Sequence, residues 1–179
     1  MKIAVINFDI YLTPYYKTAY VELFDLIQKN KQRLSNSFSK MLPQNETKDK
    51  SLLFVLDKMK QWKQKKQFAF LIFNSEDKII GHFNIREINW HKQEAELSYW
   101  LDEAYVGKGT MTAIIQTMCN WLFTTTTIKR VIAKVVVGNV ASEKVLSKNG
   151  FQYEGTLSKA CSNYYNEAQD ANQFALEKR

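Results

Sequence analysis

The amino-acid sequence predicts an α/β fold built on one mixed (α+β) sheet, in which an antiparallel meander is joined to a β-α-β unit. Three observations predict it. Apolar, strand-like stretches at 67–74, 79–87 and 95–101 are separated only by short polar turns. A glycine-spaced loop at 106–111 then opens an amphipathic helix, and a strand rich in β-branched residues follows at 130–137. Strands on short turns are typical of a meander, and a strand-helix-strand crossover makes its two strands parallel.

The N-terminal third predicts one strand and two helices. Residues 3–12 alternate between apolar and polar side chains, as a half-buried strand does. Pro14 suits the first turn of a helix, whose apolar stripe would be Tyr16, Tyr20, Leu23, Phe24 and Ile27. The polar segment 31–46 predicts a loop or a short broken helix. Residues 48–66 predict a helix with lysines on one side and, on the other, Leu52, Leu53, Leu56, Met59 and Trp62.

Turn residues and periodicity divide the remaining chain. Residues 75–78 and 89–93 read as turns, and we expect Gly81 to mark a bulge. The helix after the glycine loop, 108–123, has an apolar stripe made of Met111, Ile114, Ile115, Met118, Trp121 and Leu122. A short helix over 140–149 would end at Asn149-Gly150, a C-cap signature. Two last strands are expected, at 151–157 and 171–177.

The glycine-spaced loop is the predicted ligand site. It consists of Val106, Gly107, Lys108, Gly109, Thr110 and Met111. Glycines let a backbone adopt positive φ and approach a ligand closely, and the amides of a helix N-terminus attract anions. In sheets of this kind, ligands bind beyond the carboxyl ends of parallel strands. The loop follows strand 95–101 and residues 138–142 follow strand 130–137, so the sequence predicts a pyrophosphate cradle where the two segments converge.

Two other phosphate-binding motifs do not match. A P-loop requires G-x-x-x-x-G-K-[S/T], which Gly107-Lys108-Gly109 does not supply. A dinucleotide fingerprint requires G-x-G-x-x-G, and Thr112 stands where its last glycine would be.

Composition bounds the class of protein. With 179 residues, 45% of them apolar and 24% charged, the chain predicts a single globular domain over 1–179. No run of 18 apolar residues and no signal-peptide pattern is present, so we expect no membrane partner. Two distant cysteines, Cys119 and Cys161, fit a reducing cytoplasm better than a disulfide framework. His82 and His91 are isolated and no His/Cys cluster has metal-ligand spacing, so no metal is expected.

The formal net charge of +7 has two interpretations. One is an acidic partner, such as a polyphosphate cofactor or an RNA-rich assembly like the ribosome. The other is a set of solvated lysines on helix faces. The chain lacks an arginine cluster or a basic tract interleaved with aromatic residues, so direct nucleic-acid binding is not expected.

At this point the chain resembles the GCN5-related N-acetyltransferase (GNAT) family, and within it the RimJ/RimL-like branch that acetylates protein N-termini, notably of ribosomal proteins. The residues that carry the resemblance are AELSYWLDEAYVGKGTMT (95–112), RVIAKVVVGNVASEKVLSKNGFQYEG (130–155) and NKQRLSNSF (30–38). Two positions depart from the family. Val106 stands where Gln or Arg is usual, and Cys161 stands where RimL-like enzymes can carry an acidic general base.

The resemblance implies transfer of an acetyl group from acetyl-CoA to an amine, in a sheet splayed between strands 95–101 and 130–137. It implies cofactor contacts from Tyr99, Trp100, Leu101, Val106, Gly107, Lys108, Gly109, Thr110, Met111, Asn139 and Ser142. In the family the serine that matches Ser142 lies near the CoA sulfur, so Ser142 is the candidate donor to the leaving thiolate. The alternative interpretation is structural: Ser142 would simply lie in the first turn of a helix whose N-cap is Asn139.

Glu96 is the candidate general base, because related acetyltransferases place a base glutamate on this strand. The alternative interpretation is that Glu96 is a solvent-facing or ion-paired glutamate on a half-buried strand, with no part in catalysis. An α-amino group titrates near ~7.7–8.0, against ~10.4 for lysine, so a protein N-terminus needs little help to lose its proton. The acceptor is therefore expected to be a peptide or protein N-terminus. The alternatives are a small amine, such as a polyamine or an amine antibiotic, and a non-catalytic acyl-CoA-binding protein. Family members often form homodimers, which this chain could also do.

Overall fold

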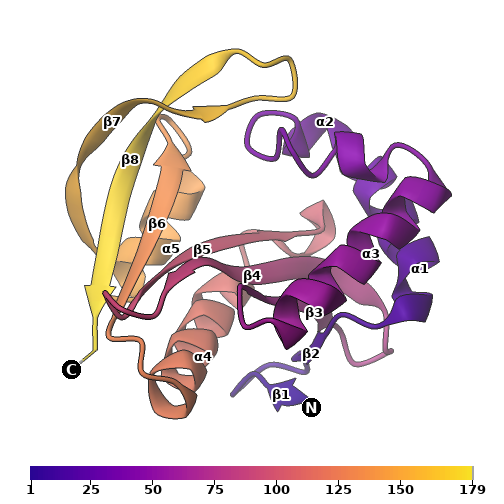
Figure 1. Ribbon diagram of the computed structural model, residues 1–179, viewed down its shortest axis with the longest axis horizontal. Helices are drawn as coiled ribbons and strands as arrows, with labels where there is room; N and C mark the ends of the chain where they lie inside the picture. Colours follow the sequence, from indigo (N-terminus) through magenta and orange to yellow (C-terminus); the bar gives the residue numbers. More distant parts are fainter. Residues whose placement is uncertain (179) are drawn as a thin grey trace.

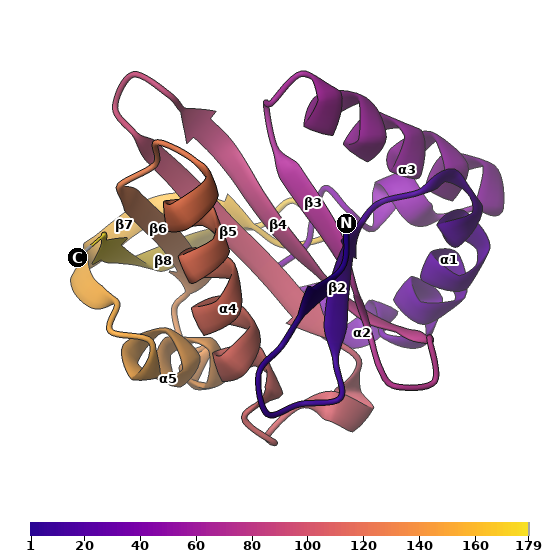
Figure 2. The same cartoon turned by 90° about the horizontal axis from the view of Figure 1, so that it is seen from below.

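The computed structural model describes residues 1–178, and Arg179, the last residue of the expected domain, lies outside the described residues. One eight-stranded sheet runs in the order β1-β2-β3-β4-β5-β6-β8-β7. Helices α1 (Tyr20–Lys29), α2 (Lys31–Leu34) and α3 (Lys48–Lys63) cover one face, and α4 (Thr110–Thr125) and α5 (Val140–Lys148) the other (Figures 1 and 2). Each face has its own buried apolar cluster. The predicted mixed α/β fold is confirmed.

The N-terminal strand is shorter and bent, which corrects the expectation of one strand over 3–12. Strands β1 (Ile3–Ala4) and β2 (Tyr11–Pro14) form an antiparallel hairpin. Asn7 adopts φ 65° in its turn, a conformation that asparagine tolerates. Pro14 ends β2 rather than beginning a helix, and α1 begins only after the short 3-10 helix η1 (Lys17–Ala19). The polar segment that follows holds α2 and a second 3-10 turn, η2 (Pro43–Asn45), as a broken helix would.

Helix α3 is where expected, but its predicted apolar stripe is only partly correct. Met59 and Trp62 pack against the core clusters as predicted. Leu53 is 66% exposed and Leu56 38% exposed, although both belong to the predicted apolar stripe. The buried residues are instead Ser51, Phe54 and Val55. The Ser51 hydroxyl donates to the side chain of buried Asn45 (2.5 Å), which satisfies a polar group in the core.

The meander is confirmed. It consists of β3 (Phe68–Phe73), β4 (Ile79–Asn89) and β5 (Glu94–Leu101), all antiparallel. The pairing of β3 with β4 shifts between Ile72 and Phe73, which leaves Ile80 as the extra residue. The bulge is therefore adjacent to Gly81, where an added Cβ would lie 2.4 Å from the Trp100 carbonyl oxygen.

The β-α-β unit is also confirmed, and its two strands part. Strand β6 (Arg130–Val136) pairs with β5 in parallel only from Glu94–Arg130 to Leu97–Ala133. Beyond that point β6 stays paired with β8 along its whole length, so the sheet divides into two arms. The predicted splay between the two strands is thus present.

The last two strands are longer than predicted. Strands β7 (Gln152–Ser162) and β8 (Ala168–Glu177) extend the hairpin well beyond the expected ranges 151–157 and 171–177. Its polar tip reaches the other arm of the sheet, where the Tyr164 amide donates to the Ser35 carbonyl (2.7 Å). In Figure 1 this yellow hairpin leans toward the loop after α2. Across residues 1–178, no helix combines the length and the apolarity that crossing a bilayer needs.

Candidate active site

The parting of β5 and β6 leaves backbone groups without a strand partner. The Trp100 carbonyl faces Gly81 on β4, and strand peptide groups alternate in direction. The peptide groups of Tyr99 and Leu101 therefore face the gap. The Arg33 guanidinium from α2 donates to the Leu101 carbonyl, so one acceptor on this edge is already satisfied.

The glycine loop lies at the mouth of this gap. Gly107 (φ 76°) and Gly109 (φ 79°) both adopt the left-handed conformation, and Gly109 is the N-cap of α4. The amides of the first turn of α4 have no partner within the helix. One expectation is corrected. The Val106 amide already donates to the Glu103 carbonyl (3.2 Å), within the 3-10 turn η3 (Glu103–Tyr105), so it is not free for a ligand.

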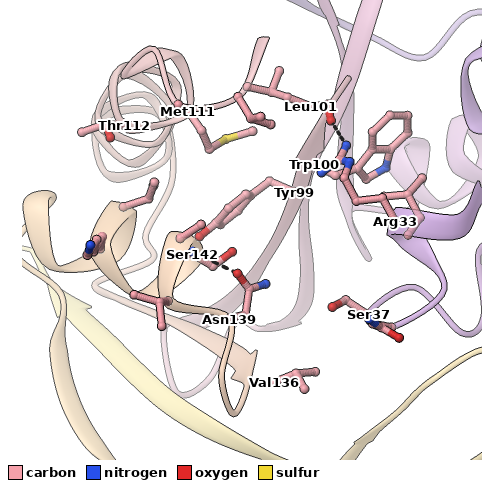
Figure 3. A pocket seen from close by; sticks show the side chains of 18 of the residues that line it. Arg33, Ser37, Tyr99, Trp100, Leu101, Met111, Thr112, Val136, Asn139 and Ser142 are labelled. Carbon is pink, nitrogen blue, oxygen red and sulfur yellow. Dashed lines mark hydrogen bonds between the residues drawn. The ribbon is translucent and has the colours of Figure 1, made fainter. Parts of the chain in front are cut away.

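A cleft of about 970 Å³, which we call the splay cleft, joins the loop to the parted strands (Figure 3). Ten of the eleven predicted cofactor-binding residues line it, namely Tyr99, Trp100, Leu101, Val106, Gly107, Gly109, Thr110, Met111, Asn139 and Ser142. Its charged lining consists of Arg33, Lys144 and Lys148, and among residues 1–178 no aspartate or glutamate lines it. The cleft therefore favours an anionic ligand over a cationic one.

Lys108 is the predicted contact that the structure does not bring into the cleft. Its ammonium group turns back to donate to the Ala104 carbonyl (2.8 Å) and lies 5.8 Å from the centre of the Tyr105 ring. Two lysines of α5, Lys144 and Lys148, line the splay cleft instead. Sequence reasoning missed them, although their spacing of four places both on one face of the short helix.

Ser142 and Tyr99 face each other across the gap. The Asn139 side chain caps α5 by accepting from the Ser142 amide (3.2 Å), which leaves the serine hydroxyl free of capping. The buried Tyr99 hydroxyl makes no hydrogen bond of good geometry within residues 1–178. Burial raises the pKa of Tyr99 above its usual range, and the neighbouring Ser142 hydroxyl opposes this shift. Figure 3 shows the three side chains converging on one end of the cleft.

Glu96 lies on the opposite side of β5 from Tyr99, and it does not line the splay cleft. Its carboxylate is 3% exposed and is bound by two cations, Arg86 (2.5 Å) and Lys134 (3.0 Å). This arrangement favours the ion-paired role that the sequence left open. The carboxylate still lies on the face of the sheet that opens toward α3.

A polar network that sequence reasoning missed ties the end of α1 to the turn that precedes the glycine loop. Asp102, at the end of β5, accepts from the Lys29 ammonium (2.7 Å) and weakly from the Asn30 side chain (3.5 Å). Asn30 in turn accepts from the Glu103 amide (3.2 Å). Although burial opposes ionisation, these bonds hold the pKa of Asp102 below its usual range. Asn30 belongs to the segment 30–38 that carried the family resemblance, but only the fold shows that it holds Asp102 and Glu103 in place.

A mixed sheet split beside a glycine loop and a helix N-terminus defines the class of protein. The family model described as acetyltransferase (GNAT) domain matches residues 10–152, and the chain belongs to this family.

The relatives give a finer comparison. A protein of Escherichia coli (strain K12), described as ribosomal-protein-serine acetyltransferase, is 34% identical over 101 residues, 56% of this chain and 55% of the relative. The chain spans about half the length of the curated relatives it matches. The solved structure of RimL, a ribosomal L7/L12 α-N-protein acetyltransferase in complex with coenzyme A, has a TM-score of 0.91 at 25% identity, covering 99% of this chain and 98% of that one. Microcin C7 self-immunity acetyltransferase MccE, in complex with acetyl-CoA and AMP, has a TM-score of 0.87 at 25% identity, covering 94% and 92%.

Proposed function

We propose that the chain is an acetyl-CoA-dependent N-acetyltransferase whose acceptor is the α-amino group of a peptide or protein. The observation that carries the proposal is the splay cleft, which has cations and free amides at its mouth and Ser142 and Tyr99 at its inner end. The activities by which the Escherichia coli relative and RimL are described support, through similarity, an N-terminal acceptor of the ribosomal-protein type.

The residues of the splay cleft fit acetyl-CoA. Amides of Gly107, Gly109 and the first turn of α4 would bind its diphosphate, and the adjoining lysines would bind further phosphate. The open edge of β5 at Tyr99 offers a peptide group that would pair with the pantetheine amides and place a donor near the thioester carbonyl. When bound, acetyl-CoA supplies an activated acetyl group.

Proton movements are assigned to this chain's own groups. We assign the Ser142 hydroxyl as donor to the leaving thiolate, because capping engages only its amide. The acceptor amine must be neutral to attack, and an α-amino group, with a pKa of about 7.7–8.0, already has a substantial neutral fraction slightly above pH 7. We keep Glu96 as the proposed base in addition to its ion-paired role: its carboxylate is held by Arg86 and Lys134 on the face of β5 turned away from the splay cleft, where water would relay the proton to it.

The experiment is coenzyme A release measured against a panel of acceptors: peptides with a free N-terminus, the same peptides with a blocked N-terminus and one lysine, and spermidine. The proposal expects turnover only with free N-termini, and a loss of about a hundredfold in Ser142→Ala. Preference for spermidine would assign the chain to small amines. Binding of acetyl-CoA in calorimetry without turnover on any amine would assign it to non-catalytic acyl-CoA binding.

A further inference from the structure

A second cleft, of about 1090 Å³, opens on the other face of the sheet. We call it the basic cleft. Its floor is formed by β4 and β5, and its walls by α3, the loop after α2 and the tip of the β7–β8 hairpin. It borders the splay cleft beneath the loop after α2, because Ser37 and Phe38 of that loop line both clefts. On β5, Ser98 lines the basic cleft and the next residue, Tyr99, lines the splay cleft. On the proposed function, the basic cleft would therefore be the route by which an acceptor reaches the inner end of the splay cleft.

Positive charge dominates this route. Five cationic side chains line it, from four separate parts of the chain: Lys40, Lys58, Lys66, Arg86 and Lys159. Only two carboxylates do, Asp57 and Glu87. Within residues 1–178 none of the four lysines forms an ion pair, so their charge is not neutralised by the protein.

Lys58 shows that the fold leaves a partly buried positive charge in the basic cleft without an ion-pair partner. Its ammonium group donates to the Gln67 side chain (3.2 Å) and lies 4.9 Å from the centre of the Phe54 ring, with no carboxylate partner. Burial lowers the pKa of Lys58, and nearby Arg86 lowers it further, while Asp57 opposes them. A partly desolvated cation beside a second cation gains from an anion that enters the cleft.

Arg86 adds to this effect despite its ion pair. Its guanidinium binds Glu96, but the other oxygen of Glu96 binds Lys134 (3.0 Å), so the cluster keeps an excess positive charge. The size of the cleft exceeds the usual range for a small ligand, about 300–1,000 Å³, so several residues of an extended chain fit.

We propose that the basic cleft selects peptides whose reactive N-terminus is followed within the first few residues by acidic side chains. This inference rests on the proposed function and names its substrate class. The acidic side chains would lie against Lys58, Lys159 and their neighbours while the amine reaches the gap beside Ser98. Polycationic amines would be repelled from the same route.

The test compares three peptides that differ only after the terminal residue: Ser-Glu-Asp-Glu, Ser-Gln-Asn-Gln and Ser-Lys-Arg-Lys, each extended by the same neutral tail. We expect kcat/KM to be about tenfold higher for the acidic peptide than for the neutral one, and lower still for the basic peptide. The preference should shrink as salt rises from about 25 to 300 mM, because screening weakens exposed charge pairs.

Variants locate the effect. Lys58→Gln and Lys159→Gln should each reduce the ratio of kcat/KM for the acidic peptide to kcat/KM for the neutral peptide severalfold. Lys63→Gln is the matched control, since it removes the same charge from α3 but outside both clefts. A loss of preference in Lys63→Gln equal to that in Lys58→Gln would overturn the assignment to the cleft.

Failure of this inference differs from failure of the proposed function. Equal kcat/KM for the acidic and neutral peptides would overturn the charge selection and leave N-terminal acetylation intact. Absence of acetylation on every peptide, with acetyl-CoA still bound in calorimetry, would overturn the proposed function itself. Acetylation of free glutamate or aspartate in preference to all peptides would overturn the peptide acceptor.

Discussion

His82 makes the stability of this protein sensitive to acid in a way that can be calculated. The side chain is 4% exposed, on the α1–α3 face of β4, and its Nδ1 is 2.9 Å from the Tyr15 hydroxyl. Burial lowers its pKa from 6.5 to about 3, with Lys58 and Arg86 adding to the effect. A base with a depressed folded-state pKa contributes stability that is present above its unfolded pKa and is lost as pH falls toward the folded value.

The magnitude follows from the window between these values. Between pH 7 and pH 5 the unfolded histidine takes up a proton that the folded one does not. This proton uptake lowers the free energy of unfolding by about 2 kcal/mol. Urea unfolding at pH 7 and pH 5 measures it. The variant His82→Gln cannot take up this proton. Between pH 7 and pH 5 its free energy of unfolding should therefore fall by about 2 kcal/mol less than that of the wild type.

The other histidine of the chain, exposed His91, is the control. His91→Gln should keep the full acid sensitivity, because removing an exposed histidine leaves the proton uptake of His82 in place. The reasoning is refuted if His82→Gln and the wild type lose the same free energy between pH 7 and pH 5. It is equally refuted if the His82 imidazole titrates near 6.5 by NMR in the folded protein.

Four further predictions concern the site. Gly81→Ala should destabilise the fold by about 1–3 kcal/mol in urea, because its Cβ would lie 2.4 Å from the Trp100 carbonyl oxygen. Asp102→Asn should raise KM for acetyl-CoA severalfold with kcat nearly unchanged in steady-state kinetics, since it loosens the tie between α1 and the glycine loop. Ser142→Ala should lower kcat about a hundredfold while acetyl-CoA affinity in calorimetry stays within twofold. Glu96→Gln should lower kcat and shift the alkaline-side pH profile, whereas an unchanged profile with reduced stability assigns Glu96 to its two ion pairs.

The parts of the fold that were predicted are those with local signals. The meander, the parallel crossover and the glycine loop each follow from periodicity, turn residues and glycine spacing within a few residues. The helix α5 and its Asn139 cap were likewise predicted from local signals. Ten of the eleven residues for which the family resemblance implied cofactor contacts line one cleft.

The parts that were missed depend on which groups pair with one another in the fold, which the pattern of residue types does not show. Leu53 appeared to be a core residue, but α3 turns Ser51, Phe54 and Val55 toward the core, where the Ser51 hydroxyl bonds to Asn45. The Val106 amide appeared to be free, but the preceding 3-10 turn engages it. The basic cleft draws its charge from four separated segments, so no single stretch of sequence indicates it.

The hairpin tip that meets the loop after α2 has a topological consequence for the acceptor. The Tyr164 amide bonds to Ser35 (2.7 Å) and the Ser162 hydroxyl to that of Ser39 (3.1 Å), while Arg33 is attached to the end of β5 at Leu101. Together with the paired base of the two strands, these links form a closed collar around the opening between the arms. On the proposed function, an acceptor that enters from the basic cleft would pass through this collar end first, which suits the free end of a polypeptide.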